Sequence, residues 1–240
     1  MKMLELPSGP SLRRLYAGFF DDFVCENTTL WTTTATDSGT STHTAQRDGV
    51  VALAPSDGTV ADNDEIYFLT PEIFLFAANS PLIVEARIQF TEANTDDANV
   101  LFGVLDAPAA NTILDDGAGP KASYSGAVMF KVDGGTTWSC ENSISTTQKT
   151  TDLDGTQPLS SDSKTAGGSS FQTLRIESRP ISSTKHDVFY WIDGALVAKH
   201  KDQVYTSATE MSVCVGAKNG GSNNESIVVD YVFAYQKRAA

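Results

Sequence analysis

The chain has 240 residues, of which 40% are hydrophobic and 20% charged, and its formal net charge is −13. This composition is that of a folded globular protein with a sizeable core. The acidic charge disfavours direct binding to nucleic acid or to anionic lipid, and no apolar stretch reaches the 18 residues that a membrane helix needs. Three widely spaced cysteines and an N-terminus without a signal-peptide apolar region predict synthesis in a reducing cytoplasm.

Residues 1–18 are predicted to form an extended N-terminal arm, because Pro7, Gly9 and Pro10 interrupt any regular element. Such an arm packs on its own domain or reaches a neighbouring subunit. The residues that we expect to contact a partner are the apolar and basic ones near its end, Leu12, Arg13, Arg14, Leu15 and Tyr16.

From residue 19 onward the pattern predicts strands. Residues 81–90, PLIVEARIQF, alternate with period two and place Leu82, Val84, Ala86, Ile88 and Phe90 on one face. Further strands are expected at 98–105, 126–132 and 171–178. The stretch 145–170 is rich in Ser, Thr and Gly, and we expect a long surface loop there.

Residues 187–200, DVFYWIDGALVAKH, predict a hairpin. Asp193-Gly194 supplies the two positive φ angles that a type I′ turn requires. Strands at 211–217 and 226–235 follow, and the last is expected to place Ile227, Val229, Tyr231, Phe233 and Tyr235 on one face. Short strands separated by Gly, Asn and Asp turns predict an all-β sandwich or barrel over residues 19–240.

Three segments resemble one family: FFDDF at 19–23, the YWIDGALVA hairpin, and the closing VVDYVFAYQ. They are similar to the concanavalin A-like jelly roll, the fold of laminarinase-type glucanases and laminin-G-like modules. The resemblance covers about residues 19–238 and implies a sandwich of two antiparallel sheets. It does not fix the function, because this fold carries enzymes, lectins and structural proteins.

The resemblance to glucanases also implies a test for catalysis. Laminarinase-type enzymes carry E-x-D-x-x-E on one strand, because retaining hydrolysis needs two carboxylates about 5–5.5 Å apart. This run is missing here; the nearest acidic cluster, Asp62, Asp64 and Glu65, lacks the second glutamate. We therefore expect no catalytic residues and no enzyme activity.

Other sites have weaker signals. The three histidines are not at metal-ligand spacing, and the Asp-rich turns around Asp62, Asp97, Asp115 and Asp152 are ordinary turn chemistry as readily as calcium ligands, so we expect no cofactor. A sugar site would need an exposed aromatic ring. Among Trp31, Trp138 and Trp191, the sequence favours Trp138 as the exposed, sugar-stacking residue because it lies beside the long loop.

Two functions fit these expectations. The first is a structural virion protein: the strand sequences resemble those of cement or decoration proteins on tailed-phage capsids, which bind the major capsid protein and copies of themselves, commonly as homotrimers. Such a protein is made in the host cytoplasm and sits on the capsid exterior. The alternative is a carbohydrate-binding, lectin-like module with a glycan as its partner.

Overall fold

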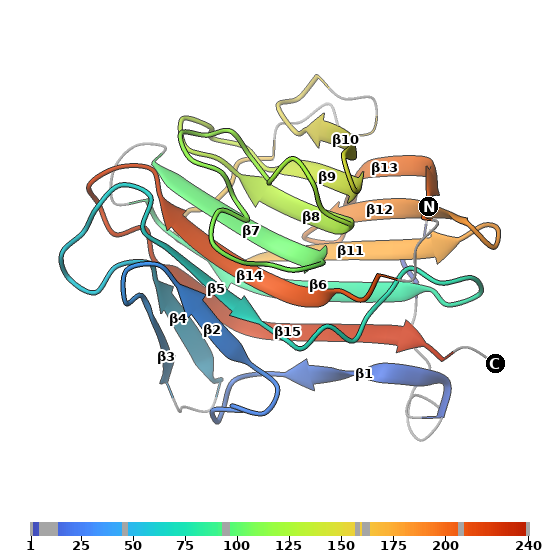
Figure 1. Cartoon of the computed structure of the whole chain (residues 1–240), viewed down its shortest axis with the longest axis horizontal. Helices are drawn as coiled ribbons and strands as arrows, with labels where there is room; N and C mark the ends of the chain where they lie inside the picture. Colours follow the sequence, from blue (N-terminus) through green and yellow to red (C-terminus); the bar gives the residue numbers. More distant parts are fainter. Residues whose placement is uncertain are drawn as a thin grey trace.

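The computed structural model describes residues 2–4, 14–44, 48–92, 97–156, 159, 164–205 and 209–238. The strands of the described residues form two antiparallel sheets that pack face to face (Figure 1). They are β1 Tyr16–Asp21, β2 Thr32–Ala35, β3 Thr40–Thr44, β4 Val50–Ala54, β5 Glu65–Leu69, β6 Leu82–Gln89, β7 Ala98–Leu105, β8 Gly126–Lys131, β9 Ser139–Ile144, β10 Thr147–Asp152, β11 Gln172–Pro180, β12 Lys185–Ile192, β13 Ala195–Val204, β14 Ser212–Asn219 and β15 Ile227–Lys237.

Sheet A has the strand order β13-β12-β11-β6-β15-β4-β3, with β1 also paired to β15. Sheet B has the order β10-β9-β8-β7-β14-β5-β2. Successive strands along the chain often belong to different sheets, as β6 and β7 do, so the two layers are tied together by crossing connections. No helix among the described residues is long and apolar enough to cross a membrane.

The main core lies between the two sheets, where the inward faces of their strands meet. The face predicted for β6 is confirmed, because Leu82, Val84, Ala86 and Ile88 are buried in this core. The same holds for the predicted hairpin of β12 and β13. Asp193 and Gly194 have φ angles of 48° and 78°, and Ile192 pairs with Ala195 across the two-residue turn.

The face predicted for β15 is wrong in its second half. Val229 pairs with Ile88 and Tyr231 pairs with Arg87, so Asp230 is an extra residue in the ladder, a β-bulge. The bulge reverses the alternation, and Val232 and Ala234 continue the buried face after Val229. Tyr231, Phe233 and Tyr235 therefore lie on the outer face of sheet A, where Tyr231 stacks on Phe233 and on Phe20 of β1.

The loop expected over 145–170 is shorter than predicted. Ser145 and Thr146 form a two-residue turn, with Ser145 at a φ of 55°, and β10 follows directly, pairing Thr147 with Ile144. β10 is a solvent-exposed edge strand. Its residues are polar because neither of its faces has to pack on the core. The sequence pattern missed this strand for the same reason.

The N-terminal arm boundary also differs from the expectation. β1 begins at Tyr16 and pairs with β15 from Lys237 onward, so residues 16–18 belong to the sandwich. Arg14 and Leu15 are exposed next to it, while Leu12 and Arg13 lie outside the described residues. Residues Lys2–Leu4 rest on the outer face of sheet A through hydrogen bonds to β11.

Candidate functional site

The outer face of sheet B is covered by the segment 106–125, which connects β7 to β8. Ile113 and Tyr124 of this cover pack on a second apolar cluster formed by β5, β7, β8 and β14; its strand members are Tyr67, Leu69, Leu101, Leu105, Val128, Phe130 and Cys214. All are buried. The open face that a sandwich would offer to a long ligand is thus filled over these strands.

Buried charges hold one end of the cover in place. Glu65 on β5 accepts from Tyr67 Oη (2.7 Å) and from the N–H of Asn111 (2.8 Å). Lys218 on β14 donates to Asn111 Oδ1 (2.8 Å), pairs with Asp115, and lies 3.5 Å from Glu65. These groups tie the cover to the sheet, and they satisfy one another's charges and hydrogen bonds.

A second buried carboxylate, Glu141 on β9, lies at the other end of the cover. It accepts from Tyr124 Oη (2.9 Å) and Gln148 Nε2 (3.0 Å), and burial raises its pKa. Three strands, β8, β7 and β14, separate β9 from β5. Across these four strand spacings Glu65 and Glu141 are at least about 19 Å apart in the sheet, far beyond the roughly 5–10 Å between the carboxylates of a glycosidase.

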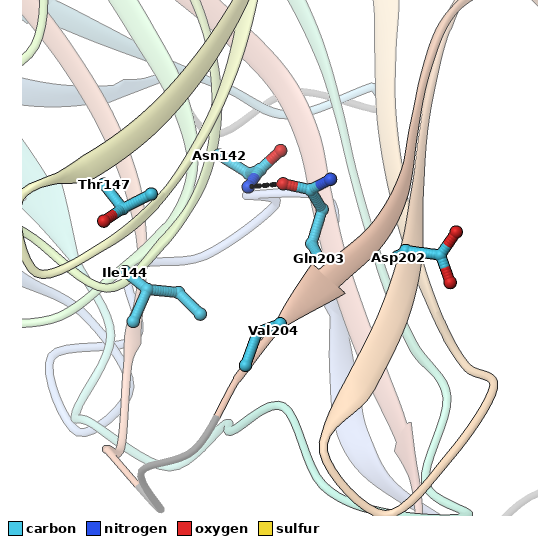
Figure 2. A pocket seen from close by; sticks show the side chains of 6 residues that line it. All are labelled: Asn142, Ile144, Thr147, Asp202, Gln203 and Val204. Carbon is cyan, nitrogen blue, oxygen red and sulfur yellow. Dashed lines mark hydrogen bonds between the residues drawn. The ribbon is translucent and has the colours of Figure 1, made fainter.

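A pocket opens at the edge of the sandwich, where β9 and β10 of sheet B face the end of β13 in sheet A (Figure 2). Its volume is about 330 Å³. The lining combines two amides, a carboxylate and a hydroxyl with two aliphatic side chains: Asn142, Gln203, Asp202, Thr147, Ile144 and Val204. We call this the edge pocket.

A bulge in β13 places Gln203 in the edge pocket. Val188 pairs with His200 and His186 pairs with Gln203, so β13 has one residue more than β12 between these pairs, and Asp202 takes a φ of 56°. His200 and Gln203, three residues apart, consequently both reach toward sheet B. Asn142 Nδ2 donates to Gln203 Oε1 (3.0 Å), which links the two sheets at their edge (Figure 2).

A chain of hydrogen bonds behind the edge pocket fixes the orientation of these amides. Burial, and secondarily Lys149, lowers the pKa of His200 to about 3, so its ring is neutral at physiological pH. Asn142 Oδ1 lies against His200 Nδ1, which must carry the proton, and His200 Nε2 then accepts from Thr151 Oγ1 (3.0 Å). Asn142 is held in one orientation from both sides.

This arrangement suits a neutral, hydroxyl-rich ligand. The amides of Asn142 and Gln203 can donate to and accept from hydroxyl groups, and the carboxylate of Asp202 accepts from them. Ile144 and Val204 provide apolar surface for C–H groups. The volume is at the small end of the range for ligand pockets. Among the described residues that line the pocket there is no pair of carboxylates and no nucleophile activated by a base.

The sugar-stacking role predicted for Trp138 is wrong, because its side chain is 0% exposed. Its indole packs edge-on against Phe90, and its Nε1 donates to Gln172 Oε1 (3.1 Å). The other two tryptophans are also buried, and Trp31 stacks on Phe68. Thr136 and Trp138 form main-chain hydrogen bonds with Ala166 and Lys164, and Thr137 forms a bridge with Thr165, so residues 164–166 run beside Trp138.

The Asp-rich turns have structural partners. Asp64 accepts from Ser56 Oγ (2.5 Å) and the N–H of Ala61 (2.8 Å), Asp115 pairs with Lys218, and Asp154 accepts from the N–H of Thr156 (2.9 Å). Within the described ranges, no group of three or more His, Cys, Asp or Glu side chains is placed to hold a metal ion.

The edge pocket was not predicted from the sequence. Asn142 and Gln203 are 61 residues apart and carry no motif. The only local signal is a polar break in the strand pattern of 200–203, HKDQ, next to an apolar run.

Comparisons with known proteins identify the fold. No protein-family model and no curated protein sequence matches the chain. Among solved structures, it is similar to the Emp47p carbohydrate recognition domain, with a TM-score of 0.58 and 14% identity over 97% of this chain and 100% of that one. It is also similar to an endo-1,3-β-glucanase from Streptomyces sioyaensis (TM-score 0.56, 19% identity, 98% and 100% covered) and to Bacillus licheniformis β-glucanase (TM-score 0.54, 13% identity, 92% and 98% covered). The chain therefore has the concanavalin A-like fold, an all-β sandwich of two antiparallel sheets, as the sequence predicted.

Proposed function

We propose that this protein is a non-catalytic carbohydrate-binding module whose edge pocket holds part of a neutral saccharide. The observation that carries the proposal is the pair of oriented amides, Asn142 and Gln203, beside the aliphatic side chains of Ile144 and Val204 in a pocket of about 330 Å³. A sugar ring presents the same combination of hydroxyl groups and C–H surface.

Two further observations support binding rather than hydrolysis. The outer face of sheet B is filled by the cover 106–125, and its two buried glutamates are too far apart to act on one glycosidic bond. The structural neighbours include a carbohydrate recognition domain and two glucanases. A carbohydrate ligand is the property that those names share.

The test is a glycan array followed by calorimetric titration with the saccharides that bind, using neutral β-gluco-oligosaccharides as the first series. Gln203→Ala removes one amide from the pocket, and we expect it to weaken binding at least tenfold. Lys201→Ala, an exposed position on the same strand but outside the pocket lining, is the matched control and should bind as the unmodified protein does. A protein that binds no glycan, or equal binding by Gln203→Ala, contradicts the proposal.

The capsid-stabilising role stays a prediction from the sequence. The net charge of −13 and the exposed Arg14 and Leu15 beside β1 are compatible with a particle surface, but no other finding supports it. Co-sedimentation with phage heads tests it directly. Binding that survives removal of residues 1–15, which ends just before β1, would contradict the predicted role of the arm.

A further inference from the structure

The N-terminal residues Lys2–Leu4 lie along β11 on the outer face of sheet A. Arg179 Nη2 donates to the carbonyl of Lys2 (2.9 Å). The N–H of Leu4 donates to both carboxylate oxygens of Glu177 (3.1 and 3.3 Å). Arg175 Nη2 donates to the carbonyl of Leu4 (2.7 Å). The segment therefore runs antiparallel to β11, with its main chain against a row of charged side chains.

These four hydrogen bonds all use main-chain atoms of the segment. Arg175, Glu177 and Arg179 follow one another at every second position of β11, so their side chains point to the same face of the sheet. They present donor, acceptor and donor groups in turn, which is the order in which an extended peptide displays carbonyl and N–H groups. The row consequently recognises an extended backbone rather than a particular set of side chains.

The charged row is rigid. Glu177 is 0% exposed although it lies on the outward face, and it pairs with Arg175 Nε (2.8 Å) and with Arg179. Arg175 also pairs with Glu85 of the neighbouring strand β6 (3.1 Å). Because these side chains fix one another, a peptide that binds here does not have to order them, which favours binding.

A buried indole adjoins the row. Trp191 lies directly across from Arg175 in the pairing of β11 with β12. Its ring is 3% exposed, and its buried Nε1 has no hydrogen-bond partner among the described residues. This atom is not open to an incoming peptide, so the three charged side chains carry the recognition. We call Arg179, Glu177 and Arg175 together the peptide strip.

The stretch of chain between Leu4 and Arg14 is long enough for the N-terminal segment to bind to another molecule. The next described residue after Leu4 is Arg14, beside β1, and β6 and β15 lie between β11 and β1. Three strand spacings amount to about 14 Å, whereas ten residues of extended chain reach about 33 Å. The chain is more than long enough to join its own sandwich, and the same length allows its end to reach a second molecule.

We propose that the peptide strip is a receptor for an extended main chain and that it receives the N-terminal segment of a second copy of this chain. Exchange of an identical segment between two copies preserves every contact made within one molecule. Assembly by this route therefore costs little free energy. This proposal is independent of the saccharide function.

The test uses full-length chains with complementary defects. Leu4→Pro removes the N–H that Glu177 accepts and disables the segment, whereas Leu4→Ala keeps that N–H and is the matched control. Glu177→Ala disables the strip. If circular dichroism shows that Glu177→Ala is unfolded, Arg179→Ala replaces it, because that side chain is less buried. Mass is followed by light scattering over a wide range of concentration.

We expect the unmodified chain and Leu4→Ala to associate with rising concentration. Leu4→Pro and Glu177→Ala, each alone, should associate at least tenfold more weakly, and their equimolar mixture should recover association because one copy contributes the segment and the other the strip. An unmodified chain that stays monomeric, a Leu4→Pro chain that associates like Leu4→Ala, or a mixture of folded variants that stays monomeric would each overturn the proposal.

Discussion

The two buried histidines predict that the native state loses stability in mild acid. His186 and His200 are each 1% exposed, and burial lowers their pKa values to about 4 and about 3, from 6.5 in an unfolded chain. Below pH 6.5 the unfolded chain therefore binds protons that the folded one does not. The stabilisation is fully present above pH 6.5 and is lost as the pH falls toward the folded pKa values.

The size of the effect follows from the two pKa shifts. A shift of one pKa unit corresponds to about 1.4 kcal/mol. At pH 4.5, two units below the unfolded pKa, each histidine therefore lowers the free energy of unfolding by about 2.5 kcal/mol and the pair lowers it by about 5 kcal/mol. This is a large share of the 5–15 kcal/mol by which domains are commonly stable. Protonation would also break the bond in which His200 Nε2 accepts from Thr151.

The assay is urea denaturation at pH 7 and at pH 4.5, on the unmodified chain and on a double variant, His186→Gln with His200→Gln. The unmodified chain should lose about 5 kcal/mol more than the double variant between the two pH values. Carboxyl groups common to both proteins cancel in this comparison, including Glu141, whose raised pKa acts in the opposite sense. If both proteins lose the same stability, the histidines are not the cause and the reasoning is wrong.

Three substitutions test the packing. Trp138→Ala should cost about 3–5 kcal/mol in a urea titration because the ring is fully buried, while Trp138→Phe should cost far less, and neither should alter saccharide binding. Lys218→Met should cost about 3–5 kcal/mol, because it leaves the buried carboxylate of Glu65 without its cation; the pH dependence of stability would show the change. Gly194→Ala should lower stability by about 1 kcal/mol in thermal denaturation through its φ of 78° alone, since nothing lies within 4 Å of the added methyl group.

The elements that the sequence predicted well are those with one buried face. β6 alternates cleanly, and the β12–β13 hairpin carries a turn whose backbone geometry demands the residues it has. Where local chemistry and tertiary packing agree, the pattern is sufficient to place the strand and its faces.

The errors arose where packing by distant residues decides the outcome. Asp230 gives no sign in the sequence that it bulges, yet it reverses the faces of Tyr231 and Phe233. Trp138 is paired through its main chain with residues 164–166, which stand beyond a polar stretch and offered no reason to expect contact. The edge pocket depends on a second bulge, at Asp202, and on two strands from different sheets. Sequence periodicity shows neither where a bulge occurs nor which distant segments pack together.

The cover over sheet B has an evolutionary consequence. The strand residues that flank it, Leu105 and Gly126, pair directly in the ladder of β7 and β8, so the whole segment 106–125 is an insertion in what is topologically a hairpin. A short turn could replace it without shifting the register of either strand, and the replacement would uncover a broad concentration of Leu, Val and Phe side chains on sheet B. Gain or loss of this one loop during evolution would thus cover or expose the outer face of sheet B.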